Sequence, residues 1–181
     1  MNLPLCSSAL PAIVVVLATL AAGCSGSVDS VGTTSAGDSP EGAPLFEAPS
    51  GDATADRIEG VWGGVLASTS SSWSFDARMR IAATSITFAT RCQREDGANG
   101  AIVAVTSRAR VTSTSLEILE SKNDARTLDG VTCRAGSHPG KIGRCAPTAL
   151  SKTDCFEMSG TSLVLHGATP LEELSLTKLS D

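Results

Sequence analysis

Tyrosine is absent from this chain of 181 residues, and only four Phe and two Trp residues supply aromatic rings. The chain also lacks a Cys-x-x-Cys pair, a Gly-x-Ser-x-Gly segment and a glycine-rich phosphate-binding loop, and it has only two histidines. These absences argue against a reactive dithiol, a structural zinc site, the nucleophile elbow of an α/β-hydrolase and a nucleotide site. We therefore expect neither a metal nor a cofactor. The scarcity of aromatic residues also argues against nucleic-acid binding.

Excess charge of either sign is missing from most of the chain. Residues 58–181 contain 13 acidic and 13 basic side chains, so the formal net charge of −5 lies between Ser25 and Arg57. That stretch is rich in Gly, Ser, Ala, Pro and Asp, and it cannot bury enough apolar surface to offset its ordering entropy. We predict that residues 24–57 form a disordered acidic linker and that one folded domain spans residues 58–181.

Long hydrophobic stretches are limited to residues 9–22, which are fewer than the roughly 20 apolar residues of a transmembrane helix. The stretch ends in Leu20-Ala21-Ala22-Gly23-Cys24, which resembles the lipobox of bacterial lipoproteins. The resemblance implies a signal peptide over residues 1–23, acylation of Cys24 by fatty acids such as palmitate, and attachment to a membrane. Ser25, the next residue, implies sorting to the outer membrane. An ordinary secretory signal cut near the same place is the alternative.

Helical periodicity is nearly absent from residues 58–181, whereas apolar and polar residues often alternate with a period of two, as along 75–81. Such alternation is typical of strands with one buried and one solvated face. We predict an all-β fold, a small antiparallel up-and-down β-barrel of about eight strands, with a β-sandwich as the alternative. The candidate strands are 58–67, 74–82, 85–94, 101–112, 115–121, 129–136, 153–158 and 162–179, the last one split near 167–170.

Gly60-Val61-Trp62, at the start of the first candidate strand, resembles the Gly-x-Trp signature of lipocalin-like (calycin) barrels. The resemblance implies that Trp62 closes one end of the barrel and that a basic residue near the last strand, Lys178, packs over it. The Thr-Asp-Tyr motif of that family is missing, and Thr153-Asp154-Cys155 is only a superficial echo of it.

Four of the six cysteines remain for pairing if Cys6 leaves with the signal and Cys24 carries lipid. An even number in an oxidising compartment predicts two disulfides, for which three pairings are possible. We favour Cys92–Cys133, which joins two candidate strands, and Cys145–Cys155, which closes a short loop.

Two sets of residues are candidates for binding. The first would line the barrel interior and hold a small apolar ligand: Trp62, Phe75, Met79 and Phe88. The second is basic and would gather on the outer face, with Arg91, to bind an envelope glycan or a partner protein: Arg78, Arg80, Arg108 and Arg110. A solvated face whose arginines pair with acids is the alternative for the second set, and side chains that fill a short barrel are the alternative for the first.

The function expected from these features is that of a monomeric, membrane-anchored cell-envelope lipoprotein with a non-catalytic β-barrel binding domain. One alternative is an inhibitor of a secreted hydrolase such as lysozyme. Another alternative is an uncharacterised hydrolase, for which His166 beside a carboxylate would be the first place to look and His138 the second.

Overall fold

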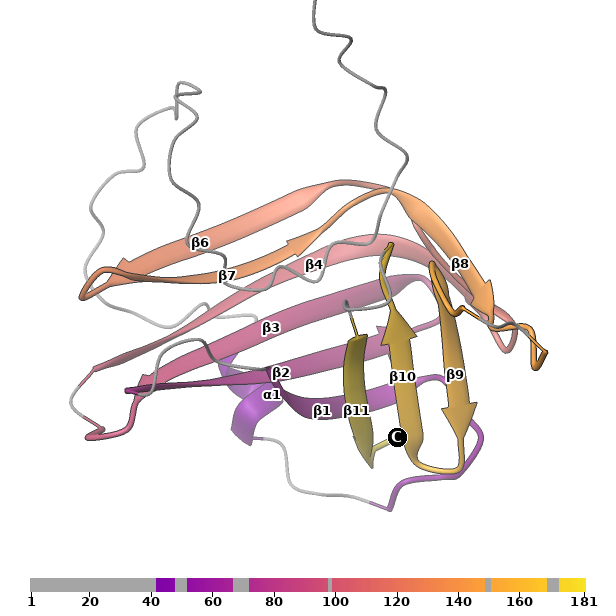
Figure 1. Cartoon of the computed structure of the whole chain (residues 1–181), viewed down its shortest axis with the longest axis horizontal. Helices are drawn as coiled ribbons and strands as arrows, with labels where there is room; N and C mark the ends of the chain where they lie inside the picture. The colour runs from indigo at the N-terminus through magenta and orange to yellow at the C-terminus, as the bar shows by residue number, and fades with distance from the viewer. Residues whose placement is uncertain (1–41, 48–51, 67–71, 98, 149–150, 169–172) are drawn as a thin grey trace, which may run out of the picture.

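The computed structural model describes residues 42–47, 52–66, 72–97, 99–148, 151–168 and 173–181 (Figure 1). It confirms the predicted all-β fold: nine strands close into a barrel in the order β1-β11-β10-β9-β8-β5-β4-β3-β2, and β6 pairs with β7 in a separate two-stranded sheet. The elements are α1 (Ala43–Glu47), β1 (Gly60–Leu66), β2 (Trp73–Ala82), β3 (Ser85–Arg94), β4 (Gly100–Thr112), β5 (Ser115–Ile118), β6 (Lys122–Leu128), β7 (Val131–Ser137), β8 (Gly140–Arg144), β9 (Cys155–Ser159), β10 (Ser162–His166) and β11 (Glu173–Ser180).

The first half of the barrel is the antiparallel meander that the sequence predicts. β1 to β5 pair consecutively, and the long strands β2 and β3 match over ten residue pairs, from Trp73–Arg94 to Ala82–Ser85. Their alternating residues place every second side chain inside, as the burial of Phe75, Met79 and Ile81 shows. The hydrophobic pattern therefore sets the register, because a slip by one residue would expose the apolar side chains.

The second half departs from a simple up-and-down order. Candidate strand 129–136 was expected in the barrel, but β7 instead forms a hairpin with β6 outside the closed ring, and β8 returns to pair with β5. The seam between β8 and β9 is parallel and has only two residue pairs, Gly143–Cys155 and Arg144–Phe156. A ring of nine strands cannot alternate in direction throughout, so one parallel pair is geometrically required, and this barrel is not antiparallel everywhere.

The β6–β7 hairpin turns at Asp129-Gly130, where both residues have positive φ (47° and 81°), as a two-residue hairpin turn demands. The hairpin lies over β3 and β4, away from β9, β10 and β11 (Figure 1). Its Cys133 is bonded to Cys92 of β3, and the Ser137 hydroxyl lies 2.5 Å from that of Ser107 in β4. Because Cys92 and Ser107 are buried side chains of β3 and β4, the hairpin extends the core beyond the barrel.

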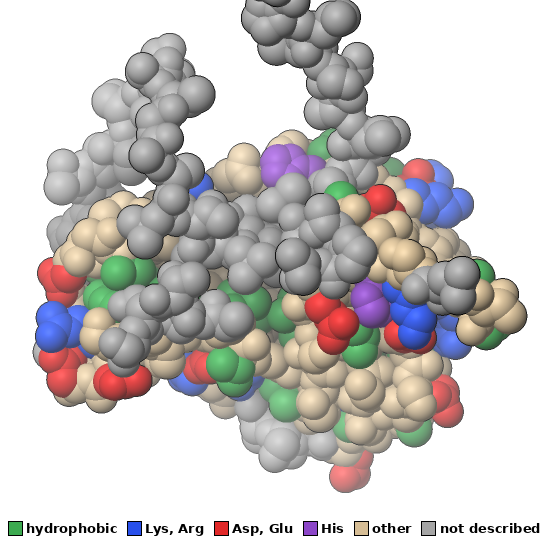
Figure 2. All heavy atoms as spheres, viewed as in Figure 1, with side chains coloured by type: hydrophobic (Ala, Val, Ile, Leu, Met, Phe, Trp, Pro, Cys, Tyr) green, Lys and Arg blue, Asp and Glu red, His purple; other side chains and the backbone are tan. Residues whose placement is uncertain are grey.

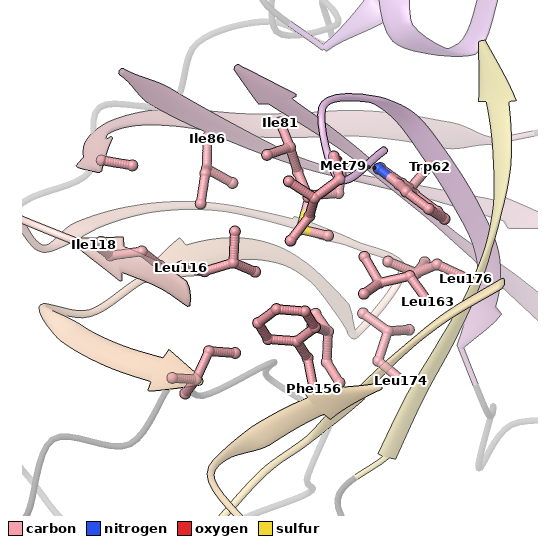
Figure 3. Close-up of a cluster of buried hydrophobic side chains, with 14 of the residues drawn as sticks. Trp62, Met79, Ile81, Ile86, Leu116, Ile118, Phe156, Leu163, Leu174 and Leu176 are labelled. Atoms are coloured by element: carbon pink, nitrogen blue, oxygen red, sulfur yellow. Dashed lines mark hydrogen bonds between the residues drawn. The ribbon is translucent and has the colours of Figure 1, made fainter. Parts of the chain in front are cut away.

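Two apolar cores result. The barrel core fills the inside of the closed ring, between the strands β1–β5 and the strands β9–β11 (Figure 3). Its fully buried side chains include Trp62, Met79, Ile81, Ile86, Phe156, Leu163 and Leu176. The hairpin core lies between the β6–β7 hairpin and the strands β2, β3 and β4. It contains Trp73, Phe75, Cys92, Val103, Val105, Cys133 and Ala135. Leu66 and Phe88 are half-buried and pack against both cores.

Part of the predicted linker is ordered, so the prediction of disorder over all of 24–57 is wrong. We call residues 42–47, which include helix α1, the strap. Leu45 of the strap is only 2% exposed and lies with Val61, Ala89 and Ala104 on the outside of the barrel. Burial of two apolar side chains against a matching apolar surface can offset the conformational entropy lost when a short segment is ordered. The composition of the segment does not reveal that such a surface exists. Residues 24–41 lie outside the described part of the chain.

Both predicted disulfides, Cys92–Cys133 and Cys145–Cys155, are present. The second one joins the end of β8 to the start of β9, next to the two-pair seam. No helix in the described ranges is long and apolar enough to span a membrane. The predicted signal peptide and Cys24 lie among the residues that the structure does not describe.

Candidate functional site

The four residues predicted to line a ligand site do not lie together in one place. Trp62 and Met79 are buried in the barrel core, where neighbouring side chains pack against them (Figure 3). Phe75 belongs to the hairpin core, and Phe88 is half-buried between the two cores. The structure thus separates a filled end of the barrel, around Trp62, from an end near the hairpin where apolar side chains remain partly accessible.

Lys178 packs over Trp62 at the filled end. Trp62 Nε1 donates a hydrogen bond to the carbonyl of Ile58 (2.9 Å), and Lys178 Nζ lies 5.7 Å from the centroid of the Trp62 ring. The Lys178 side chain is fully buried. Its ammonium donates to the carbonyls of Thr54 (2.9 Å) and Arg57 (3.2 Å), so residues just before β1 are tied to the last strand.

Asp181 balances the buried charge of Lys178. One carboxylate oxygen of Asp181 lies 2.5 Å from Lys178 Nζ, and the carboxylate also accepts hydrogen bonds from the backbone and hydroxyl of Thr54. These bonds, that from Lys178 above all, lower the pKa of Asp181 from 3.8 to about 2. The charge pair therefore ties the chain end to the residues before β1 and stabilises this end of the barrel.

Half-buried apolar side chains gather at the other end, which we call the hairpin end: Leu66, Phe88, Leu128 and Val131. They come from β1, from β3 and from the two strands beside the Asp129-Gly130 turn, and they pack around the buried Trp73 and Phe75. Partly accessible apolar side chains of this kind are what sites for small apolar ligands present. The alternation of β2 and β3 predicted Phe75 and Phe88 as inward-facing residues. Nothing local to 128–131 indicated that the hairpin would fold over them.

The four predicted surface arginines do not form one patch. Arg108 and Arg110 of β4 are exposed and paired with Glu120 (3.3 Å) and Glu117 (2.9 Å), which is the solvated alternative. The backbone N–H of Arg108 is the chief cause of the lowered pKa of Glu120. Arg80 is exposed on β2. On the face in Figure 2, acidic side chains lie beside basic ones at both ends of the molecule, so no surface of a single sign is seen there.

Arg78 has a different environment from the other three. Its guanidinium carbon lies 5.2 Å from the ring centroid of Phe46 in the strap, and that of Arg91 lies 4.9 Å from the same centroid. Arg91 is in turn held by Asp76 at 2.5 Å. Burial is the chief cause that lowers the pKa of Arg78. The strap residues Leu45 and Phe46 carry no motif, and their apolar character within a polar stretch is the sequence feature that suggests docking on the domain.

His166, the first candidate for a hydrolase, lies on the outside of β10 between carboxylates. Its Nε2 is 3.1 Å from Glu157 and its Nδ1 is 3.9 Å from Glu173, while Lys152 binds Glu157 at 2.7 Å. The hydrogen bonds from Lys152 and then His166 lower the pKa of Glu157. Activation of a nucleophile requires a hydroxyl or thiol at one ring nitrogen, whereas the partners found here are carboxylates. This cluster stabilises the outer surface of β9–β11.

His138, the second candidate, lies 3.3 Å through Nδ1 from the hydroxyl of Ser121. Within the described ranges, no three His, Cys, Asp or Glu side chains are arranged to hold a metal ion. The hairpin end has partly accessible apolar side chains and the strap packs on an apolar surface, so these two places are the candidates for binding.

No protein-family model matches this chain, and neither a curated protein nor a solved structure shows significant similarity to it. Its function must therefore be inferred from its own residues.

Proposed function

We propose that this protein is a membrane-anchored cell-envelope lipoprotein whose non-catalytic β-barrel binds a small apolar ligand at the hairpin end. The observation that carries the binding proposal is the set of half-buried apolar side chains around Trp73 and Phe75. Leu66 and Phe88 belong to this set and also touch the barrel core, so a ligand there would join two packed regions.

The hairpin end is favoured over the Trp62 end because the latter is occupied by the protein's own side chains. Trp62, Met79 and Phe156 fill that part of the barrel, and the buried Lys178 covers it. Transfer of an alkyl chain from water to apolar surroundings is favourable by about 0.8 kcal/mol per methylene. A chain of about fifteen carbons would gain about 12 kcal/mol, and an association cost of about 4 kcal/mol leaves about 8 kcal/mol, which is a micromolar affinity.

The two tryptophans allow a direct test, because Trp73 lies at the hairpin end and Trp62 at the filled end. The chain would be prepared with Trp62→Phe or Trp73→Phe, so that each variant fluoresces from one site. A brominated long-chain alcohol, whose bromine quenches indole fluorescence on contact, is titrated into each. We expect saturable quenching of Trp73 and little quenching of Trp62, and none with the unbrominated alcohol.

A matched pair of substitutions provides the control. Phe88→Gln removes an apolar side chain from the hairpin end, whereas Val65→Gln changes a side chain that is 75% exposed. The first should weaken quenching of Trp73 about tenfold and the second should leave it unchanged, with both variants retaining the circular dichroism of the parent. Equal quenching of both tryptophans, or no saturable quenching of Trp73, would rule out the site.

The anchoring part of the proposal rests on the lipobox and is tested separately. The protein isolated from the membranes of its source cells, or of a bacterium that processes lipoproteins, should have a mass that begins at Cys24 and includes acyl chains. The Cys24→Ser variant should lose both the added mass and the membrane association. A soluble chain with an unmodified N-terminus at residue 23, 24 or 25 would contradict the anchor without affecting the binding test.

A further inference from the structure

The strap packs against an apolar surface on the outside of the barrel. Leu45 is buried against Val61, Ala89 and Ala104, which are side chains on the outside of β1, β3 and β4. Leu179 of β11 also packs there. We call this surface the outer wall. It is apolar although it faces away from both cores, where strand residues are ordinarily polar.

Close contact with the outer wall depends on small residues. A Cβ on Gly42 would lie 2.7 Å from Ile102 Cγ2 and 2.9 Å from Ala104 Cβ, both too short for carbon atoms. The strap backbone therefore approaches β4 as closely as glycine allows, and the Leu45 N–H closes a turn on the Gly42 carbonyl (3.0 Å). Such complementarity distinguishes a built contact from a chance collapse of a tail onto the nearest apolar surface.

The second part of the contact is a clamp of two arginines around the Phe46 ring. The guanidinium groups of Arg78 and Arg91 lie about equally far from its centroid, at 5.2 Å and 4.9 Å, and Asp76 fixes Arg91 by a 2.5 Å ion pair. Two cations against one carboxylate leave this spot positive, which suits the electron-rich face of an aromatic ring and an acidic residue after it. Glu47 follows Phe46 in the strap.

Few side chains hold the strap on the wall, whereas fixing its backbone costs conformational entropy at every residue. Leu45 is its one fully buried large side chain and Phe46 is half-buried, whereas Pro44 and Glu47 are exposed. Six residues lose backbone freedom for these contacts, so the occupied state of the wall should be favoured over the vacated state by only about tenfold, which is about 1.4 kcal/mol. A contact of this kind exchanges readily with a competitor of the same chemistry.

We infer that the outer wall is a peptide-binding surface and that the strap is its resident occupant. A partner polypeptide would displace the strap by presenting an aliphatic residue, then an aromatic residue for the arginine clamp, then an acid. This surface lies on the outside of the barrel and is independent of the apolar ligand proposed for the hairpin end.

The test uses the full chain with Leu45→Asp and Phe46→Ser, so that its own strap cannot occupy the wall. A fluorescent peptide with the sequence of residues 40–49 is titrated into this variant and into the parent, and binding is followed by anisotropy. We expect saturable binding to the variant and binding at least about tenfold weaker to the parent, whose strap competes. A peptide with serine in place of the phenylalanine should not bind either protein.

Additional substitutions in the strap-free chain locate the site. Arg91→Ala should weaken peptide binding about tenfold, whereas Arg110→Ala, on the same side of the sheet but paired with Glu117, should not alter it. Circular dichroism and intact disulfides establish that each variant is folded. Absence of saturable binding to a folded strap-free chain, equal binding to the parent, or equal loss from both arginine variants would overturn the inference.

Discussion

Replacement of Lys178 by methionine tests how much the closed end of the barrel contributes to stability. Methionine is close in length and apolar, so it can fill the space over Trp62 but cannot donate the two hydrogen bonds to the carbonyls of Thr54 and Arg57. Charge-assisted hydrogen bonds of this kind contribute about 1.5 kcal/mol each. The variant should therefore lose about 3 kcal/mol of unfolding free energy at neutral pH, a loss of the size expected when one member of a buried polar cluster is removed.

The loss should depend on pH through Asp181. Because the pKa of Asp181 is lowered to about 2 in the folded protein, its carboxylate stabilises the fold above its ordinary pKa of 3.8, and that contribution disappears as the pH falls through about 2. Lys178 is the chief cause of the lowering, so the variant lacks most of this dependence. The difference in stability between parent and variant should be constant above about pH 5 and should narrow between about pH 4 and pH 2.

Urea denaturation followed by circular dichroism, at a series of pH values, measures both effects. Lys152→Met is the matched control, since Lys152 makes a comparable ion pair with Glu157 but lies at the surface, where such pairs contribute about 0–1 kcal/mol. A loss for Lys178→Met no larger than that of the control would refute the reasoning. A difference that stays constant down to pH 2 would refute the role given to Asp181.

Three further outcomes are expected. Dithiothreitol under native conditions should reduce Cys145–Cys155 before the other disulfide, because both of its cysteines are half-exposed whereas those of the other pair are 0% and 1% exposed; mass spectrometry after alkylation gives the order. Phe156→Ala, at the centre of the barrel core, should destabilise the protein by about 3–5 kcal/mol in urea titrations. Arg110→Ala should change the unfolding free energy by less than about 1 kcal/mol, since its ion pair with Glu117 is exposed to solvent.

The strands with clear alternation are those that the sequence predicted well. Candidate strand 85–94 coincides with β3, and 74–82 and 101–112 each differ from β2 and β4 by one residue at the start. In these strands the apolar face has to be buried, so local pattern and final structure depend on the same physical requirement. The disulfide between Cys92 and Cys133 could be predicted for a related reason, because both cysteines lie on the buried faces of their strands.

The sequence did not predict strand β6 or the place of the hairpin outside the ring, and only the apolar pair Leu45-Phe46 suggested that the linker docks on the domain. These features depend on contacts between residues far apart in the chain. β6 carries Lys122, Asp124 and Arg126 and shows no apolar alternation, so it forms a strand only through its pairing with β7. Arg78 was expected in a basic patch that binds a glycan or a partner protein. Instead, its guanidinium group packs on the ring of Phe46, 32 positions earlier in the chain. Contacts of this kind leave no signal within a short window, and they decide where both proposed binding surfaces lie.

The closure of the barrel also determines the order in which the chain can mature. β1 is completed by β11, with Val61 opposite Ser180, so the ring stays open until the last strand is available for pairing. The meander β2–β4 and the β6–β7 hairpin have all their partners by residue 137, and Cys92–Cys133 can be oxidised at that stage. We therefore expect an early oxidised half, followed by a slow step of ring closure dominated by the long sequence separation of β1 and β11.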